Sequence, residues 1–140
     1  MLRGIPATIS PALLKALSEM GHGSEIVLAD GNFPAVDCVP EERIIRCDGI
    51  GLPSVLSDIL KIFPLDETTD NVVLMSSDDG TKPAIHACYE EVLASYPEAR
   101  VKSIGRFEFY PRAKGAHAVL ITGEKSPYAN VLLKKGTIHE

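Results

Sequence analysis

Residues 20–34 read MGHGSEIVLADGNFP, in which one histidine and one aspartate bracket an apolar run. Its centre, Glu25–Ala29, is too short and too rich in β-branched residues for a helix, so it predicts a buried strand between two glycine-containing turns. His22 precedes this strand and Asp30 follows it, at opposite ends or close together if the chain folds back. Loops at the ends of buried strands often carry function in α/β proteins. A single histidine after a helix is nevertheless more often a solvated or capping residue.

The flanking sequence predicts a helix before the strand. Ser10 can cap free N–H groups, and Pro11 suits the first helical position because it lacks a donor. Four apolar residues then recur on one helix face: Leu13, Leu14, Leu17 and Met20. Gly21 is expected to end this helix in a left-handed conformation.

The remaining periodicity predicts strands at 43–47, 71–75, 101–104, 116–121 and 130–135, and helices at 53–62 and 83–95. Residues 106–114 are ambiguous, because alternating aromatic residues favour a strand whereas residues 112–114 favour a helix; we expect a helix. Helices alternate with strands, which predicts one three-layer α/β/α domain over residues 1–140. Its sheet should be mixed and mostly parallel, with antiparallel pairing allowed for the terminal strands.

Composition limits the possible partners. The chain has 140 residues, 14 lysines and arginines against 19 aspartates and glutamates, and a net charge of -5. No basic run offsets this charge, so a nucleic-acid partner is disfavoured. No apolar segment approaches the roughly 18 residues that a membrane span needs, and no leader pattern opens the chain. Three scattered cysteines without a C-x-x-C pair indicate reduced, partly buried thiols, and we expect a cytoplasmic protein with no membrane partner.

Several common motifs are absent. Gly21-His22-Gly23 lacks the third glycine of a dinucleotide fingerprint, and residues 80–82 do not fit a phosphate loop. The four histidines lack metal-ligand spacing, and no G-x-S-x-G elbow or activated cysteine is evident. We therefore expect no metal, no cofactor and no covalent catalysis. His86 and His117 are interpreted as exposed-helix and strand-face residues without a role.

What remains is a set of side chains suited to proton transfer and hydrogen bonding: His22, Asp30, Asp66, Arg106, Tyr110, Tyr128 and Asn130. Arg106 and Tyr110 are four residues apart and would share one face of a helix. Taken alone, this pair is better explained as packing of an aromatic helix with an arginine whose stem covers apolar surface.

Three segments resemble the sugar mutarotase family of ribose pyranases and fucose mutarotases, and the fucose mutarotase branch most closely. They are residues 21–34, 106–116 (RFEFYPRAKGA) and 121–137 (ITGEKSPYANVLLKKGT). The likeness covers almost the whole chain and is weaker over 38–100, apart from short segments at 45–49 and 64–66. The resemblance implies an isomerase that interconverts the anomers of a reducing monosaccharide. It also implies a homo-oligomer, often a decameric ring in bacteria.

The resemblance also implies roles for individual residues. His22 corresponds to the general acid/base, Tyr110 to a catalytic tyrosine and Asp66 to an associated aspartate. Sugar binding is implied for Asp30, Arg106, Tyr128, Ala129 and Asn130. For this, Arg106, Tyr110 and residues 128–130 must reach the strand end that carries Asp30. Ala129 stands where fucose mutarotases usually have glycine, and Gly31-Asn32 also departs from the common pattern. L-fucose or a related pyranose is expected as substrate; D-ribose pyranase activity and a non-catalytic monosaccharide-binding regulator are the alternatives.

Mutarotation fits these residue types. One proton must reach the ring oxygen and another must leave the anomeric hydroxyl, giving an open-chain aldehyde that recloses on its other face. Histidine suits both transfers because its unperturbed pKa lies near neutral pH. Such general acid-base help contributes typically ~10² to 10⁴ in rate. Asp30, Arg106 and Asn130 would pair the hydroxyl groups of a buried sugar.

Overall fold

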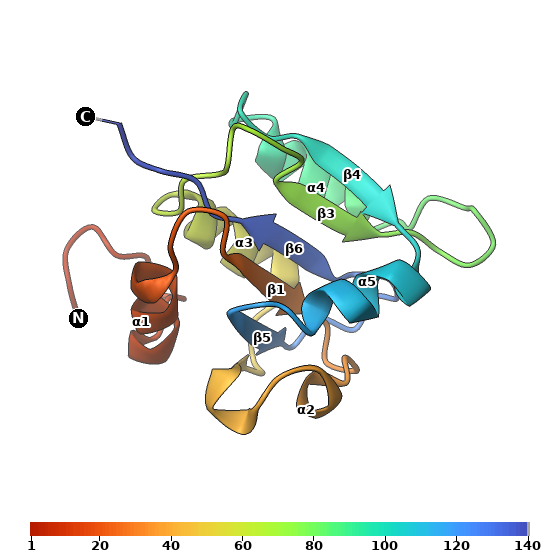
Figure 1. The fold of residues 1–140 in the computed structure, drawn as a ribbon, viewed down its shortest axis with the longest axis horizontal. Helices are drawn as coiled ribbons and strands as arrows, with labels where there is room; N and C mark the ends of the chain where they lie inside the picture. The colour runs from red at the N-terminus through yellow and green to blue at the C-terminus, as the bar shows by residue number, and fades with distance from the viewer. Residues whose placement is uncertain (140) are drawn as a thin grey trace.

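A computed structural model describes residues 1–139, and a six-stranded sheet in the order β2-β5-β1-β6-β3-β4 forms its centre (Figure 1). Five strands run parallel, whereas β6 runs antiparallel to its neighbours β1 and β3. The strands span β1 Glu25–Ala29, β2 Ile44–Cys47, β3 Val72–Met75, β4 Val101–Ile104, β5 Ala118–Thr122 and β6 Val131–Lys134. The mixed, mostly parallel sheet predicted from the sequence is confirmed.

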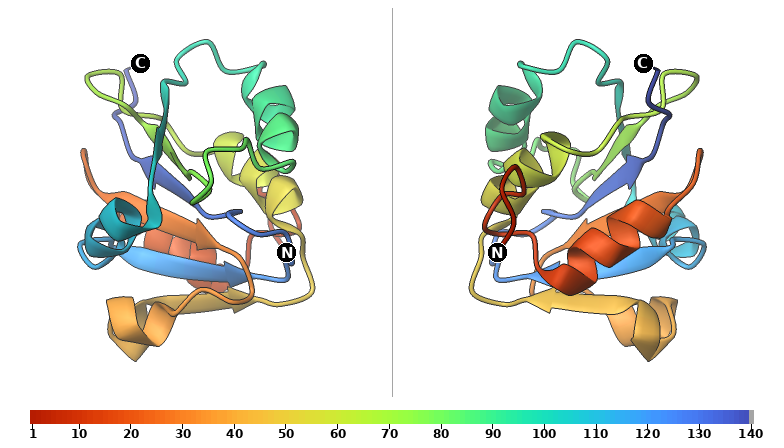
Figure 2. Two further views of the ribbon diagram at one scale, coloured as in Figure 1. Left: turned by 90° about the vertical axis from the view of Figure 1, so that its right-hand side faces the viewer. Right: turned by 90° about the vertical axis from the view of Figure 1, so that its left-hand side faces the viewer.

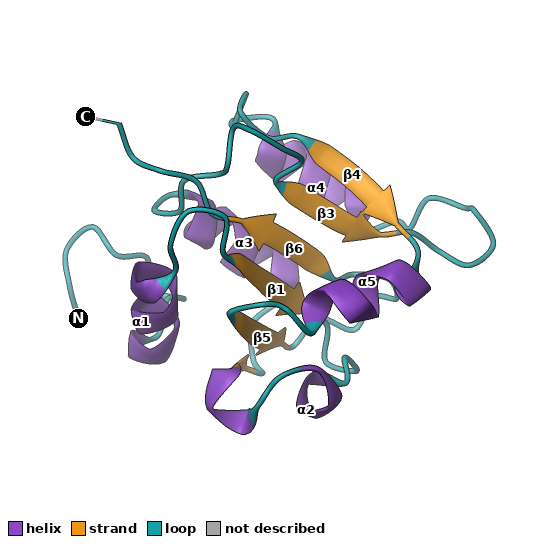
Figure 3. Ribbon diagram, in the orientation of Figure 1, coloured by secondary structure: helices purple, strands orange, loops and turns teal. Residues whose placement is uncertain are grey.

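Helices cover both faces of this sheet. They span α1 Pro11–Glu19, α2 Ala35–Cys38, α3 Leu52–Leu60, α4 His86–Leu93 and α5 Arg106–Ala113, with a 3₁₀ turn at Glu41–Arg43. The apolar residues of α1, α3 and α4 share one core cluster, and those of α2 and α5 share the other. Figures 2 and 3 show α3 and α4 on one side of the sheet and α2 and α5 on the other. The α/β/α layering is therefore confirmed.

Strand β1 is apolar from Ile26 to Ala29 because both of its faces are covered by helices. Ile26 and Leu28 face the α1, α3 and α4 side, whereas Val27 and Ala29 face the α2 and α5 side. All four are fully buried, because a central strand of a covered sheet has no solvent face. Burying one Val or Leu side chain is worth about 1.5–3 kcal/mol. The strand is thereby fixed as the centre of both cores.

The predicted start of α1 agrees with the structure, but its predicted end does not. Ser10 Oγ accepts the backbone N–H of Leu13 at 3.1 Å, as expected for a capping serine. The prediction that Gly21 ends the helix in a left-handed conformation is wrong. Met20 leaves the helix in an extended conformation with φ -62° and ψ 134°, and Gly23 is the residue with positive φ, at +86°. The turn that carries His22 therefore bends after the histidine instead of before it.

Other differences are local. Residues 106–113 are helical, as predicted, but α4 begins at His86 instead of at residue 83, and β5 begins at Ala118. Helix α2 was missed because four residues are too few to show a helical period. The interpretation of His86 as an exposed helix residue is wrong, since its exposed fraction is 4%. All three cysteines are free; Cys38 and Cys47 are half-buried, but Cys88 is exposed, contrary to expectation.

Within residues 1–139, no helix combines the length and the apolar character needed to cross a membrane.

Candidate functional site

One edge of the sheet gathers most of the polar side chains singled out in the sequence. The carboxyl ends of the parallel strands meet there, and the first residue of β6 joins them because that strand runs the other way. Ligands of α/β proteins commonly bind at this edge. It holds a pocket of about 220 Å³ lined by Asp30, Asn32, Phe33, Met75, Arg106, Tyr110, Pro127, Tyr128 and Asn130. Ligand pockets for drug-sized molecules are roughly 300–1,000 Å³, so this one suits a smaller compound.

Three clearly larger hollows lack such a convergence of polar groups. The hollow of about 380 Å³ lies between residues 1–9 and the start of α1 and is lined mainly by apolar residues. One of about 660 Å³ lies beside α2 and β2 and is lined mainly by apolar residues, together with Glu41 and Arg46. Another of about 500 Å³ lies between α1 and the chain after β6 and is also largely apolar. A binding site needs a few placed polar groups in addition to volume, so the smaller pocket is the better candidate.

Asp30 is held at the end of β1 by two neighbours. Its backbone N–H donates to Asn130 Oδ1 at 2.8 Å, and its Oδ1 accepts the N–H of Asn32 at 2.9 Å. The side chain is only 8% exposed, and this burial raises its pKa, with a further upward contribution from the charge of Glu124. The N–H of Asn32 works in the opposite direction. Asp30 is thus a fixed carboxyl group that binds a proton more readily than an exposed aspartate.

Asn130 links β6 to two other lining residues. Its Oδ1 is occupied by Asp30, and its Nδ2 lies 3.8 Å from Met75 Sδ. Thioether sulfur is a weak acceptor, and an amide nitrogen carries two donors. The amide can therefore give a hydrogen bond to a ligand hydroxyl without breaking its contact with Asp30.

Helix α5 supplies Arg106 and Tyr110 from one face, as the spacing predicted. Arg106 Nη2 lies 3.3 Å from Asp78 Oδ2, and its guanidinium carbon lies 4.8 Å from the centre of the Phe107 ring. The Tyr110 ring packs 5.6 Å from that of Phe33. Burial, and then the charge of Asp30, raises the pKa of Tyr110. Its hydroxyl therefore keeps its proton at neutral pH and can both donate and accept.

The segment before β6 has an unusual backbone. Tyr128 lines the pocket with φ at 55°, the left-handed region that non-glycine residues seldom adopt. Ala129 is fully buried, and its side chain belongs to the core on the α1, α3 and α4 side. The structure thus places Tyr128 and Asn130 at the pocket but turns the side chain of Ala129 away from it.

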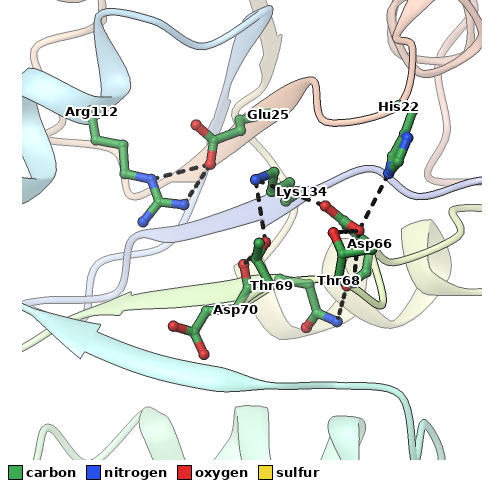
Figure 4. Close-up of polar contacts among 9 residues, drawn as sticks. His22, Glu25, Asp66, Thr68, Thr69, Asp70, Arg112 and Lys134 are labelled. Atoms are coloured by element: carbon green, nitrogen blue, oxygen red, sulfur yellow. Dashed lines mark hydrogen bonds and ion pairs between the residues drawn. The ribbon is translucent and has the colours of Figure 1, made fainter.

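His22 and Asp66 lie at the opposite edge of the sheet (Figure 4). The five residues of β1 that separate His22 from Asp30 span on the order of 13 Å. His22 Nε2 lies 3.4 Å from Asp66 Oδ1, and the imidazole is 54% exposed whereas the carboxylate is buried. The hydroxyl and backbone N–H of Thr68 lower the pKa of Asp66 to about 2, and His22 contributes in the same direction. Asp66 is therefore an ionised carboxylate that orients the imidazole.

A second small pocket surrounds this pair. It measures about 240 Å³ and is lined by His22, Leu65, Asp66, Glu67, Thr68, Thr137 and His139. Lys134 Nζ lies 3.8 Å from Asp66 Oδ2 and donates to Thr69 Oγ1 (Figure 4). Among residues 1–139, no group of three or more histidine, cysteine, aspartate or glutamate side chains is arranged to hold a metal ion. Within one chain, the candidate residues thus form two separate groups.

Sequence reasoning missed part of the pocket and its support. Asn32, Phe33, Met75 and Pro127 line it. Met75 is the last residue of β3, Asn32 and Phe33 follow Asp30 within three residues, and Pro127 precedes Tyr128. Glu124 was also missed. Its carboxylate accepts the N–H of Leu52 at the start of α3 and the hydroxyl of Ser126, which orders the loop after β5. A lone glutamate after a strand carries no pattern that would have revealed this.

Comparison with known proteins gives the family. Residues 3–138 match the RbsD / FucU transport protein family. The chain is 46% identical to human fucose mutarotase, over 98% of this chain and 94% of that one. The structure of the Streptococcus pneumoniae fucose mutarotase in complex with L-fucose is similar with a TM-score of 0.91 and 42% identity, over 99% and 100% of the two chains. Bacillus subtilis RbsD, solved in complex with D-ribose, shares the fold at 23% identity and a TM-score of 0.76, over 99% and 100% of the two chains. These matches extend over nearly the whole sequence, and the chain belongs to the RbsD / FucU family.

Proposed function

We propose that this protein is a sugar mutarotase, an isomerase that interconverts the α and β anomers of L-fucose or a related pyranose. The observation that carries the proposal is the convergence of Asp30, Arg106, Tyr110, Tyr128 and Asn130 on one pocket of about 220 Å³. The identity of 42–46% with fucose mutarotases over nearly the full chain supports it. We also propose that the protein works in the cytoplasm, in keeping with its free cysteines.

The pocket offers complementary partners for a small polyol. A buried sugar must have its hydroxyl groups paired, because each unpaired polar group costs about 1–3 kcal/mol. Asp30 supplies acceptors, Arg106 and Asn130 supply donors, and Tyr110 supplies either. Phe33 and Met75 add apolar surface for the carbon-bound hydrogens of the ring. Such a mixture suits a neutral monosaccharide better than an apolar compound.

Ring opening requires one group that protonates the ring oxygen and one that accepts the proton of the anomeric hydroxyl. We assign one of these two proton-transfer roles to Tyr110, which retains its proton at neutral pH because burial raises its pKa. We assign the second role to His22, whose imidazole is oriented by Asp66. Reclosure on the other face of the aldehyde reverses both transfers, so each group ends the turnover in its initial state.

His22 cannot serve the pocket of its own chain, because β1 separates them. We therefore propose that the protein is a homo-oligomer in which His22 of one copy completes the pocket of another. Apolar side chains exposed at the two edges support this arrangement. Phe107 is 81% exposed next to Arg106, and Ile138 is 66% exposed beside the cavity that adjoins His22. Contact between two copies at these edges would remove both side chains from water, which favours association.

The function is tested by NMR saturation transfer between the two anomers of L-fucose, with D-ribose, D-galactose and D-glucose as comparison sugars. Faster exchange of L-fucose than in buffer is expected. Faster anomer exchange of D-ribose than of L-fucose would instead indicate a ribose pyranase. Binding of sugar without accelerated exchange for any of the four would mean a non-catalytic monosaccharide-binding protein.

A further inference from the structure

Tyr128, which lines the candidate pocket, has a strained backbone. Among residues 1–139 it is the single non-glycine residue with positive φ. A bulky residue in this region is strained, and such a conformation persists only where the surroundings hold it. The loop between β5 and β6 supplies three lining residues, Pro127, Tyr128 and Asn130. What holds this loop therefore decides the shape of the pocket.

Two buried side chains of α4 bind consecutive carbonyl groups of that loop. His86 Nε2 lies 3.2 Å from the carbonyl oxygen of Tyr128, and the Tyr89 hydroxyl donates to the carbonyl oxygen of Ala129 at 2.5 Å. The exposed fractions of the two side chains are 4% and 0%. They are three residues apart on one helix face, with ring centres 6.0 Å apart. Neither lines the pocket, so any effect on a ligand passes through the loop.

Both groups are in the protonation state that this contact requires. A carbonyl oxygen can only accept, so the hydrogen must reside on His86 Nε2. Burial lowers the pKa of His86 and so favours the neutral ring, and Lys82 acts in the same direction; the carbonyl group of Tyr128 and the charge of Glu90 act in the opposite direction. Burial raises the pKa of Tyr89, so that its hydroxyl remains a donor. Two donors therefore face two acceptors throughout the neutral pH range.

The loop is also joined to the backbone of Asp30, whose side chain lines the pocket. Ala129 is followed by Asn130, whose Oδ1 accepts the backbone N–H of Asp30. A displacement of the peptide units at residues 128 and 129 would thus move Tyr128 and Asn130 directly, and Asp30 through Asn130. Helix α4 packs in the layer opposite α5, so residues on both sides of the sheet shape one pocket.

We propose that His86 and Tyr89 are positioning residues that hold Tyr128 in its left-handed conformation and thereby set the sugar-binding geometry. The proposal rests on the function proposed above, because that function makes this pocket a sugar-binding site. It gives a role to a histidine that the sequence indicated to be without one. It also explains how an L-tyrosine is maintained at a position where glycine would be unstrained.

Three variants test it with matched controls. Tyr89→Phe removes one oxygen atom, His86→Leu removes the donor to Tyr128, and His86→Gln places an amide donor near the position of Nε2. Tyr96→Phe and His117→Leu are the controls, since neither side chain makes a hydrogen bond among the described residues or lines the pocket. For each folded variant, the KM and kcat of anomer exchange are measured together with the free energy of unfolding in urea. Tyr89→Phe and His86→Leu are expected to raise KM by roughly 3- to 10-fold, the effect of one lost hydrogen bond. His86→Gln should recover most of this loss.

An unchanged KM and kcat in folded Tyr89→Phe, with only a lower free energy of unfolding, would overturn the proposal, because a purely structural contact behaves in that way. Should His86→Leu fail to fold, Tyr89→Phe still decides. The NMR chemical shifts of Tyr128, assigned through Tyr128→Phe, provide a readout that is independent of catalysis. They should move in Tyr89→Phe and stay in place in Tyr96→Phe, and unmoved shifts in both would contradict the proposal. Absence of anomer exchange in the unmodified protein would contradict the proposed function alone.

Discussion

The backbone N–H of Asp30 donates to the side-chain oxygen of Asn130 at 2.8 Å, although 100 residues of chain separate them. This hydrogen bond joins the end of β1 to the start of β6, the adjacent antiparallel strand. It fixes the amide of Asn130 relative to the backbone of Asp30 before any ligand arrives, and the N–H of Asn32 holds the carboxylate of Asp30. Sites that are ordered in advance lose less entropy on binding.

Asn130→Ala should lower both stability and sugar affinity. The N–H of Asp30 would lose its partner in a buried position, which costs about 1–3 kcal/mol. Urea unfolding and the KM for L-fucose exchange measure the two effects. Asn130→Asp retains the acceptor oxygen but places a negative charge beside Asp30, so KM should remain high. If the Asn130→Ala protein kept the wild-type KM, Asn130 would have no role in sugar binding.

His22→Ala should reduce kcat by roughly 10²- to 10⁴-fold, the usual contribution of one general acid/base group. Sugar binding should persist, because the lining residues at the other edge are untouched. Asp66→Asn should give a smaller loss, since it disturbs the orientation of the imidazole but leaves it present. Saturation transfer gives kcat, ligand-detected NMR gives binding, and His117→Ala is the control for loss of a histidine. Exchange at the wild-type rate in His22→Ala would exclude His22 as the proton-transfer group.

Mixed oligomers distinguish a shared site from one contained in a single chain. His22→Ala and Asp30→Asn should each be inactive alone. When the two are unfolded together and refolded, roughly a quarter of the sites would combine an intact pocket with an intact imidazole from another copy, if subunits assort at random. The mixture should therefore regain measurable exchange. Persistent inactivity of a properly assembled mixture would argue that both residues must come from one chain.

Asp30→Asn should stabilise the protein at pH 7 while abolishing sugar binding. The folded pKa of Asp30 is raised by burial, so the stability associated with its protonated form is lost as pH rises through that pKa. Removing the charge avoids this loss, and Asn retains an acceptor for the N–H of Asn32. Asp66 has the opposite sign. Its folded pKa is about 2, so its contribution is present above pH ~4 and is lost as pH falls from ~4 toward 2.

Urea unfolding of the wild-type, Asp30→Asn and Asp66→Asn proteins from pH 2 to pH 8 measures both effects. The gain for Asp30→Asn should be largest at the upper end of this range and should vanish in acid. The loss for Asp66→Asn should likewise be largest above pH ~4 and should vanish as pH falls toward 2, because only the ionised carboxylate stabilises the fold. If the free energy of unfolding changed with pH in the same way in all three proteins, neither carboxyl group would contribute to the pH dependence.

Much of the fold was predictable because it follows from local patterns. The apolar run of β1, the capping Ser10 and the helical spacing of Arg106 and Tyr110 each depend on residues close in sequence. The family resemblance required Arg106 and Asn130 to meet Asp30 at one edge of the sheet, and the structure places them around one pocket there.

Other features depend on contacts that no local pattern encodes. His86 has the sequence context of an exposed helix residue, but it is buried and its ring contacts the β5–β6 loop, which is distant in sequence. The left-handed conformation of Tyr128 has no signal in its own side chain. The separation of His22 from Asp30 was left open by the sequence, since it depends on whether the chain reverses between them. The continuous strand between them decides this point.

The placement of His22 and Asp30 at the two ends of β1 limits how many pockets an assembly of copies can complete. A chain that offers its imidazole at one edge and its pocket at the opposite edge would join its neighbours head to tail. An open row of such chains leaves one pocket without an imidazole at its end, and an isolated chain leaves every pocket incomplete, whereas a closed ring completes them all. Specific activity would then fall when the protein is diluted below the concentration at which the ring holds together.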